Sequence, residues 1–135
     1  MEGMQVSINY LAVIVVTILS FLIGFIWYGP LFGKPWMEAN NITKENVASR
    51  KMSLIFGTSI VLTLIIALNL AAFLGPKADF SFGLFAGAAT GIGFISAAIG
   101  VTYAFSGKSL KLFFIDAGYW TVVLILMGAI LGVWK

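Results

Sequence analysis

Residues 112–134 read LFFIDAGYWTVVLILMGAILGVW, and this stretch decides the fold. It is longer than the roughly 20 apolar residues that a helix needs to cross a bilayer. Further stretches of the same kind cover residues 6–28, 52–74 and 82–105. The whole chain of 135 residues is 61% hydrophobic and only 10% charged, whereas soluble domains carry about 25% charged residues. The sequence therefore predicts an integral membrane protein with four transmembrane helices.

The connections between these stretches predict how the helices are arranged. Gly75-Pro76 and Ser106-Gly107 are typical of tight turns, and short turns place successive helices antiparallel. We therefore predict an all-α, antiparallel, up-down four-helix bundle with one longer cytoplasmic loop, in a single transmembrane domain over residues 1–135. Thr43 can cap a helix that begins near Lys44 and continues through Arg50 and Lys51. The expected helices then cover residues 6–28, 44–74, 82–105 and 112–134.

The basic residues predict the orientation. Six of the eight lie in the loops after the first and third stretches, namely Lys34, Lys44, Arg50, Lys51, Lys108 and Lys111. The other two, Lys77 and Lys135, lie on the other side of the membrane. Because cytoplasmic loops are enriched in Lys and Arg, we expect both loops in the cytoplasm and both termini outside. The first stretch is too long for the apolar region of a signal peptide. A multi-pass protein of the plasma (inner) membrane is expected.

Composition also narrows the chemistry. Cysteine and histidine are absent, which argues against disulfides, histidine-ligated haem, the usual zinc sites and a Ser-His-Asp triad. No cofactor, metal site or catalytic residue is predicted. The net charge of +3 comes from residues spread over loops, so membrane lipids rather than nucleic acid are the expected partners.

Asp116 is the only charged side chain inside the four apolar stretches. It lies about 7–8 Å along a helix from Lys111, so its position is shallow, where aligned N–H groups of the helix start favour an anion. One interpretation is a structural ion pair or hydrogen bond with Arg50, Lys51, Lys34 or a Trp indole N–H. The other is a role in binding or proton handling.

Residues 25–37, FIWYGPLFGKPWM, contain two prolines and two glycines that stop the first helix, with aromatic side chains typical of the headgroup level. We call this segment the elbow. Antiparallel helices bring it to the same membrane face as Asp116. The predicted binding site for a ligand or partner comprises Trp27, Tyr28, Lys34, Trp36, Arg50, Tyr103, Asp116, Tyr119 and Trp120. Tyr119 and Trp120 share a helix face with Asp116, but they could equally be aromatic belt residues.

Two sets of residues are predicted to pack helices together. Gly83, Gly87 and Gly91 repeat at four-residue spacing, which lets helices approach closely within or between subunits. A glycine-lined pore or groove is the alternative. Asn9 and Asn69 lie at similar depth and could hydrogen-bond to each other across the first two helices.

Residues 27–37 of the elbow, WYGPLFGKPWM, are followed by a polar loop, two helices and the late segment Ile115-Asp116-Ala117-Gly118-Tyr119. This combination resembles the small prokaryotic membrane proteins of the domain of unknown function 1761 family. The likeness spans nearly the whole chain. It implies a four-helix membrane protein from a bacterium or archaeon, and it transfers no reaction.

Three functional hypotheses remain open. The leading one is a non-enzymatic membrane protein that self-associates, as a homo-oligomer or a subunit of a larger complex, and binds lipid headgroups or a partner around Asp116. The alternative is a small transporter or channel in which Asp116 titrates or binds a cation. An enzyme acting on lipid or isoprenoid substrates would need Asp116 as general base and Lys34 or Arg50 on a phosphate, but it lacks a second membrane acid and a P-loop.

Overall fold

The computed structural model describes residues 8–43, 45–46 and 50–134, and these residues form helices without strands. Four helical spans are long and apolar enough to cross a membrane: Tyr10–Leu31, Met52–Leu74, Phe80–Ser106 and Leu110–Val133. This confirms the all-α class and the four apolar spans expected of a multi-pass membrane protein.

The first span changes its helical geometry at the elbow. Helix α1 (Tyr10–Ile26) continues into the π-helical turn η1 (Trp27–Leu31). A proline in a helix cannot donate a backbone hydrogen bond, and its ring displaces the carbonyl of the preceding turn, so Pro30 is accommodated by the wider turn. Phe32 N–H reaches the Trp27 carbonyl at 2.8 Å.

A short helix completes the elbow. Helix α2 (Gly33–Ala39) follows η1 directly, and the sequence did not predict it. A Cβ at Gly33 would overlap the Tyr28 carbonyl, so this join requires glycine. Asn41, in the left-handed region with φ 56°, follows the end of α2.

The second span begins later than expected. Helix α4 covers Met52–Leu74, and Lys51 before it has extended backbone, with φ −77° and ψ 96°. The predicted continuous helix through Arg50 and Lys51 is therefore wrong. Lys44, its expected first residue, lies outside the described residues. The Thr43 hydroxyl does accept a hydrogen bond from Asn46 N–H at 3.1 Å, as a cap would. The break before Met52 means that α4 does not extend from the membrane as one long helix.

The third span has a wide turn in its middle. Helix α5 (Phe80–Thr90) continues through the π-helical turn η2 (Gly91–Ser96) into α6 (Ala97–Ser106). Gly107, at φ 71°, ends α6. Helix α7 (Leu110–Val133) then forms the last span, capped by Ser109 through a 3.1 Å bond from Leu112 N–H.

Helix α5 packs on α7 at backbone contact distance. A Cβ added to Gly83 would overlap the Gly128 carbonyl, and one added to Gly128 would overlap the Gly83 carbonyl. Gly87 meets the Leu124 carbonyl in the same way, and Gly91 lies against Thr121. The glycine repeat therefore packs within one chain, because its open side is already filled by α7.

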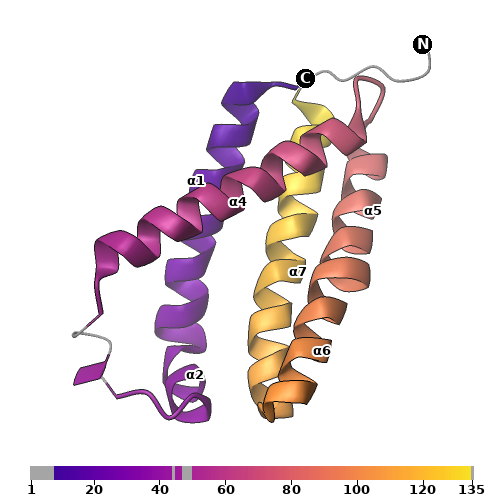
Figure 1. Ribbon diagram of the computed structural model, residues 1–135. Helices are drawn as coiled ribbons and strands as arrows, with labels where there is room; N and C mark the ends of the chain where they lie inside the picture. The colour runs from indigo at the N-terminus through magenta and orange to yellow at the C-terminus, as the bar shows by residue number, and fades with distance from the viewer. Residues whose placement is uncertain (1–7, 44, 47–49, 135) are drawn as a thin grey trace.

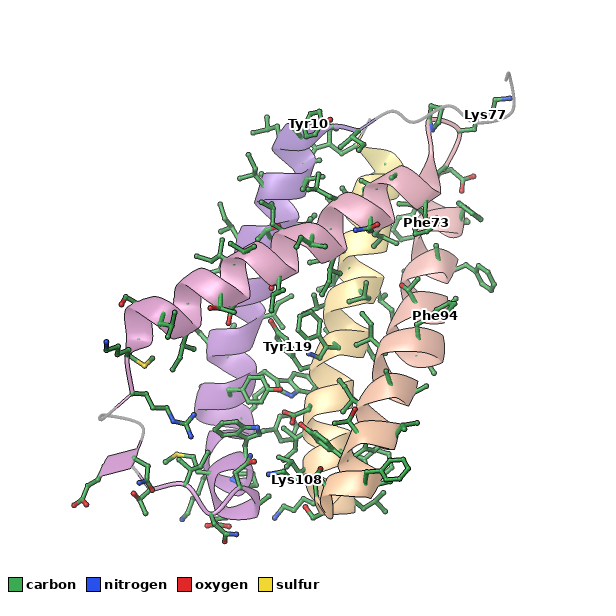
Figure 2. The ribbon with its side chains drawn as sticks, viewed as in Figure 1. Tyr10, Phe73, Lys77, Phe94, Lys108 and Tyr119 are labelled. Atoms are coloured by element: carbon green, nitrogen blue, oxygen red, sulfur yellow. The ribbon has the colours of Figure 1, made fainter. Side chains whose placement is uncertain are left out.

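Figure 1 shows α1, α7 and the α5–α6 span side by side, with α4 crossing obliquely in front of α1 and α7. Tyr10 and Lys77 lie at one end of the molecule and Lys108 at the other (Figure 2). Of the four spans, α7 is the most buried. Its Val123, Leu124 and Met127 meet α1 and α4 in the apolar core.

Large apolar side chains cover the outside of the bundle. Phe73 is 80% exposed and Phe94 is 73% exposed, and both project away from the helices in Figure 2. A soluble protein rarely shows so much contiguous apolar surface. The outer surface therefore suits hydrocarbon rather than water.

Candidate functional site

The Asp116 carboxyl group accepts three side-chain hydrogen bonds. Tyr28 donates to Oδ1 at 2.6 Å, the Trp36 indole N–H donates to the same oxygen at 3.1 Å, and the Tyr103 hydroxyl donates to Oδ2. All three partners donate, and the carboxyl oxygens of Asp116 accept. We call these four residues the Asp116 cluster.

The donors reach Asp116 from three separate segments. Tyr28 belongs to η1, Trp36 to α2 and Tyr103 to α6, while Asp116 itself lies in the first two turns of α7. The π-helical turn at Pro30 and the tight join at Gly33 set the direction in which the elbow folds back. One carboxylate thereby connects the ends of three spans.

A second contact fixes the elbow beside the cluster. The Trp27 indole N–H donates to the Ile115 carbonyl at 2.9 Å, and its ring approaches Gly118 so closely that a Cβ there would lie 3.0 Å from the ring. Trp27 also packs on Phe32, with ring centroids 4.8 Å apart. The elbow is thus held to α7 both through Asp116 and through the backbone next to it.

Of the partners expected for Asp116, the structure selects aromatic donors. Lys34, Arg50 and Lys51 are exposed, and within the described part of the chain none of them forms a hydrogen bond or ion pair through its side chain. The expected salt bridge is therefore absent among these residues, and an indole N–H with two tyrosine hydroxyls takes its place. The sequence predicted Tyr28 and Tyr103 near Asp116, but not as its hydrogen-bond donors.

Tyr119 and Trp120 lie beside the cluster rather than in it. The Tyr119 hydroxyl donates to the Ser20 carbonyl of α1 at 2.8 Å, and its ring lies 5.3 Å from that of Tyr28 and 5.2 Å from that of Trp120. The three rings form a continuous aromatic wall from the elbow toward the middle of the bundle.

The two asparagines do not pair with each other. Asn9 accepts a bond from Ala12 N–H and caps α1, while the Asn69 amide donates to the Ile65 carbonyl of its own helix. The bond expected between them is not formed. At its exposed position, Asn69 is satisfied locally by α4.

An open pocket of about 590 Å³ lies against the outer side of the elbow. We call it the elbow pocket; six of its lining residues are Tyr28, Gly33, Lys34, Met37, Glu38 and Thr43. It combines one cation, one carboxylate and hydroxyl groups with the thioether of Met37. Of the residues predicted for the site, it includes Tyr28 and Lys34. Arg50, Tyr103 and Asp116 do not line it.

Sequence reasoning missed several polar groups inside the bundle. The Ser96 hydroxyl, in η2, forms hydrogen bonds with the Ala117 carbonyl and the Thr121 hydroxyl of α7. Thr63 of α4 is buried. The available signal was modest, namely serine and threonine within apolar helices. Because such residues usually bond to their own helix, their spacing does not distinguish those that face a neighbour.

Comparison with known proteins agrees with the motif resemblance. Residues 11–132 match a family described as "Protein of unknown function (DUF1761)". Neither a curated protein nor a solved structure matches the chain.

Proposed function

The chain belongs to the DUF1761 family, whose description assigns no activity, and we propose that it is a non-enzymatic membrane protein that binds lipid headgroups in its elbow pocket. The observation that carries the proposal is the combination of an open pocket lined by Lys34 with an elbow held in place by Asp116. A fixed elbow keeps the pocket in one shape, and a preformed pocket binds with less ordering cost.

The chemistry of the lining supports a phosphate-containing headgroup. Lys34 is exposed and, among described residues, its ammonium group has no partner, so it is available to a lipid phosphate. The two lining hydroxyls already donate within the protein, Thr43 to Asn46 Oδ1 at 2.8 Å and Tyr28 to Asp116, so Lys34 is the group that meets the phosphate. Trp36 and Tyr28 stand at this end of the bundle, as aromatic residues commonly do at headgroup level.

Charge distribution supports the cytoplasmic leaflet as the source of the lipid. Lys34, Arg50, Lys51, Lys108 and Lys111 lie in or next to the connections after the first and third spans, whereas Lys77 is at the opposite end from Lys108 (Figure 2). By the positive-inside bias, the elbow end of this plasma-membrane protein faces the cytoplasm and both termini face the outside. Anionic lipids of that leaflet attract juxtamembrane cations.

Association with a second copy or a larger complex would need another surface than the glycine repeat. That repeat is filled by α7 of the same chain, so the exposed apolar exterior is the available face. Chemical crosslinking in native membranes measures this part of the proposal.

The transporter alternative receives less support from the geometry. A titrating or cation-binding Asp116 would have to exchange with a pathway, yet its two oxygens accept three bonds from protein donors. Asp116 lines neither the elbow pocket nor the pocket between α1, α4 and α7. Proton or cation flux that disappears in Asp116→Asn proteoliposomes would favour the transporter.

The proposal is tested by native mass spectrometry of the chain released from mixed vesicles of phosphatidylglycerol and phosphatidylcholine. We expect bound phospholipid on the wild type and a several-fold loss of it in Lys34→Gln. Lys108→Gln is the matched control, because Lys108 lies at the same end but does not line the elbow pocket. Equal lipid retention by both variants would refute the role of Lys34.

A further inference from the structure

A second pocket, of about 360 Å³, opens between α1, α4 and α7 where α4 leans across the bundle. We call it the mid-span pocket. Its volume lies within the range of about 300–1,000 Å³ typical of small-molecule sites. It shares Tyr28 with the elbow pocket but is otherwise lined by different residues.

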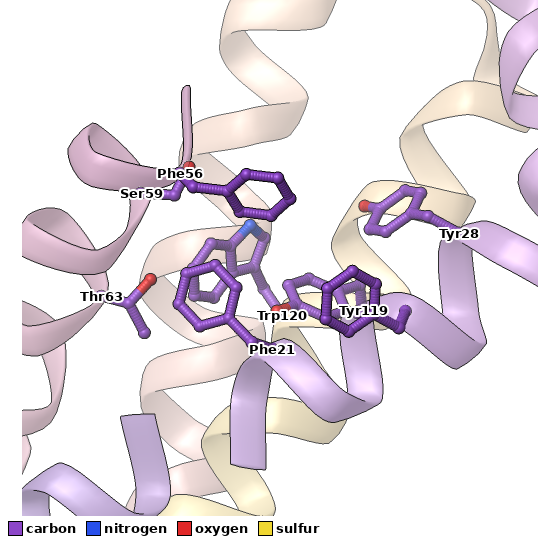
Figure 3. Close-up of a pocket in the computed structure, with 9 residues that line it drawn as sticks. Phe21, Tyr28, Phe56, Ser59, Thr63, Tyr119 and Trp120 are labelled. Carbon is purple, nitrogen blue, oxygen red and sulfur yellow. The ribbon is translucent and has the colours of Figure 1, made fainter. Parts of the chain in front are cut away.

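Aromatic rings form two sides of the mid-span pocket (Figure 3). On one side Phe21 and Phe25 of α1 each pack against Phe56 of α4, with centroids 6.3 and 6.2 Å apart. The other side is formed by Tyr119 and Trp120 of α7. Flat walls of this kind suit a planar ring, which can stack on them or meet their edges.

Thr63 provides an unsatisfied polar group in this apolar setting. It is only 5% exposed, it lines the pocket, and Figure 3 shows its hydroxyl directed toward the aromatic rings. Thr17 and Thr90 donate to carbonyls of their own helices, but the Thr63 hydroxyl has no hydrogen-bond partner anywhere in the described part of the chain. Since no fully buried side-chain oxygen or nitrogen among described residues lacks a partner, the Thr63 hydroxyl is not fully buried, and Thr63 lines the mid-span pocket.

Two more polar side chains line the mid-span pocket without a hydrogen-bond partner among the described residues. Ser59, one turn before Thr63 on α4, and Trp120 on α7 both line the pocket, and neither side chain forms a hydrogen bond with a described residue. Figure 3 shows the Trp120 ring nitrogen on the side of Phe56 and Ser59. Two hydroxyls and an indole N–H therefore offer donors to whatever enters, and the indole offers nothing else.

The depth of these donors indicates where the ligand resides. Thr63 is the middle residue of α4, and Trp120 lies ten positions into α7, so each is about 15 Å along its helix from the nearer end, although Thr63 lies less deep than that because α4 runs obliquely. This level belongs to the hydrocarbon core, whose half-thickness is about 15 Å. The ester carbonyls of phospholipids stay at the border of this core and do not reach the donors. Inside the core, a polar group without a hydrogen-bond partner is costly. The partner is a molecule that dissolves in the hydrocarbon and carries its own acceptor oxygens.

We propose that the mid-span pocket binds a planar, membrane-soluble ring compound bearing carbonyl oxygens, the chemistry of a quinone. The ring lies between the Phe21–Phe56 pair and the Tyr119–Trp120 wall, and a carbonyl oxygen accepts from Thr63 and Trp120. The proposal concerns binding alone. It does not depend on the headgroup site of the elbow pocket.

The test uses the full chain in lipid nanodiscs with decyl-benzoquinone as probe and its oxygen-free analogue decylbenzene as control ligand. Saturable quenching of tryptophan fluorescence by the quinone gives its dissociation constant, and the affinity of decylbenzene, which does not quench, is measured by its competition with the quinone. We expect Thr63→Val to weaken quinone binding about fivefold to tenfold, the loss of roughly one hydrogen bond, with a similar effect for Trp120→Phe. Thr58→Val is the matched control, because Thr58 is an exposed residue of the same helix that does not line the pocket, and it should leave binding unchanged.

A filling variant makes the test independent of any single hydrogen bond. Ser59→Leu adds apolar volume to the pocket and should abolish saturable quinone binding while the protein stays folded, as checked by thermal unfolding. Equal affinity for decylbenzene would identify a hydrocarbon chain as the occupant and overturn the proposal. So would the same affinity in Thr63→Val as in Thr58→Val, or no saturable binding at all. Lys34→Gln should leave quinone binding unchanged, which separates failure of this site from failure of the elbow pocket.

Discussion

Tyr28 and Asp116 are 88 residues apart in the sequence, and the tyrosine hydroxyl lies 2.6 Å from the carboxylate oxygen. Trp36 shares that oxygen, and Tyr103 takes the other one. Hydrogen bonds to a charged acceptor are roughly twice as strong as neutral ones. The Asp116 cluster should therefore contribute measurably to stability, whatever the pockets bind.

Asp116→Asn should destabilise the protein by about 3 kcal/mol. The amide replaces one acceptor oxygen by an NH₂ group that faces a donor, and the charge that strengthened every bond is lost. Unfolding by sodium dodecyl sulfate in mixed micelles measures the change. Asp79→Asn is the control, because Asp79 only caps α5 by accepting from Phe82 N–H at 2.8 Å, and asparagine caps equally well. Equal effects of the two substitutions would contradict the cluster.

Tyr28→Phe and Tyr103→Phe should each cost about 1.5–3 kcal/mol, because each removes one charge-assisted donor and leaves the ring in place. Tyr10→Phe, at an exposed residue, should have no effect. In the Asp116→Asn background the two cluster substitutions should cost much less, since residues in one network are not additive. Full additivity in this double-mutant cycle would show that the tyrosines act independently of Asp116.

Gly83→Ala and Gly128→Ala should each destabilise by about 3 kcal/mol or more, because the added methyl group meets a backbone carbonyl that cannot move aside. Gly57→Ala, where a Cβ finds open space, should stabilise by about 0.5–1 kcal/mol through helix propensity. Unfolding measures the stability of each variant, and light scattering measures its oligomeric state. If Gly83→Ala changed the oligomeric state without loss of stability, the repeat would pack between chains instead.

Trp27→Phe should destabilise by about 1 kcal/mol, the typical value of a single neutral hydrogen bond. The substitution removes the indole N–H that donates to the Ile115 carbonyl and reduces the packing on Gly118. Trp134→Phe, at an exposed position after α7, provides the control. Both are read from the midpoint of thermal unfolding, and indistinguishable midpoints would be evidence against the contact.

Hydropathy located the four spans because each apolar run exceeds the thickness of the bilayer core. The residues around Asp116 could be predicted from the order of the spans. Antiparallel spans bring the elbow, α6 and the start of α7 to the same end. Tyr28, Trp36 and Tyr103 were in the expected set, and they are the three donors. Lys34 and Arg50 were in the same set, but they are exposed cations that form no hydrogen bond or ion pair with Asp116 among the described residues.

The remaining features depend on distances that a sequence does not contain. The π-helical turn at Trp27–Leu31 contains Pro30, whereas the helix α2 and the break before Met52 have no comparable signal in the sequence. Whether Gly83 meets a helix of its own chain or of another cannot be read from four-residue spacing. A threonine in a helix usually bonds to its own helix, so the sequence gives no sign that the Thr63 hydroxyl lines a pocket without such a bond.

The order of synthesis determines when the Asp116 cluster can form. Its donors belong to segments made first and third, while the shared acceptor is translated last. A nascent chain that has inserted three spans therefore has no group on which the elbow can dock. The elbow becomes fixed only when the final span enters, so its docking reports that insertion is complete. A chain truncated before Asp116 should leave its elbow accessible to protease.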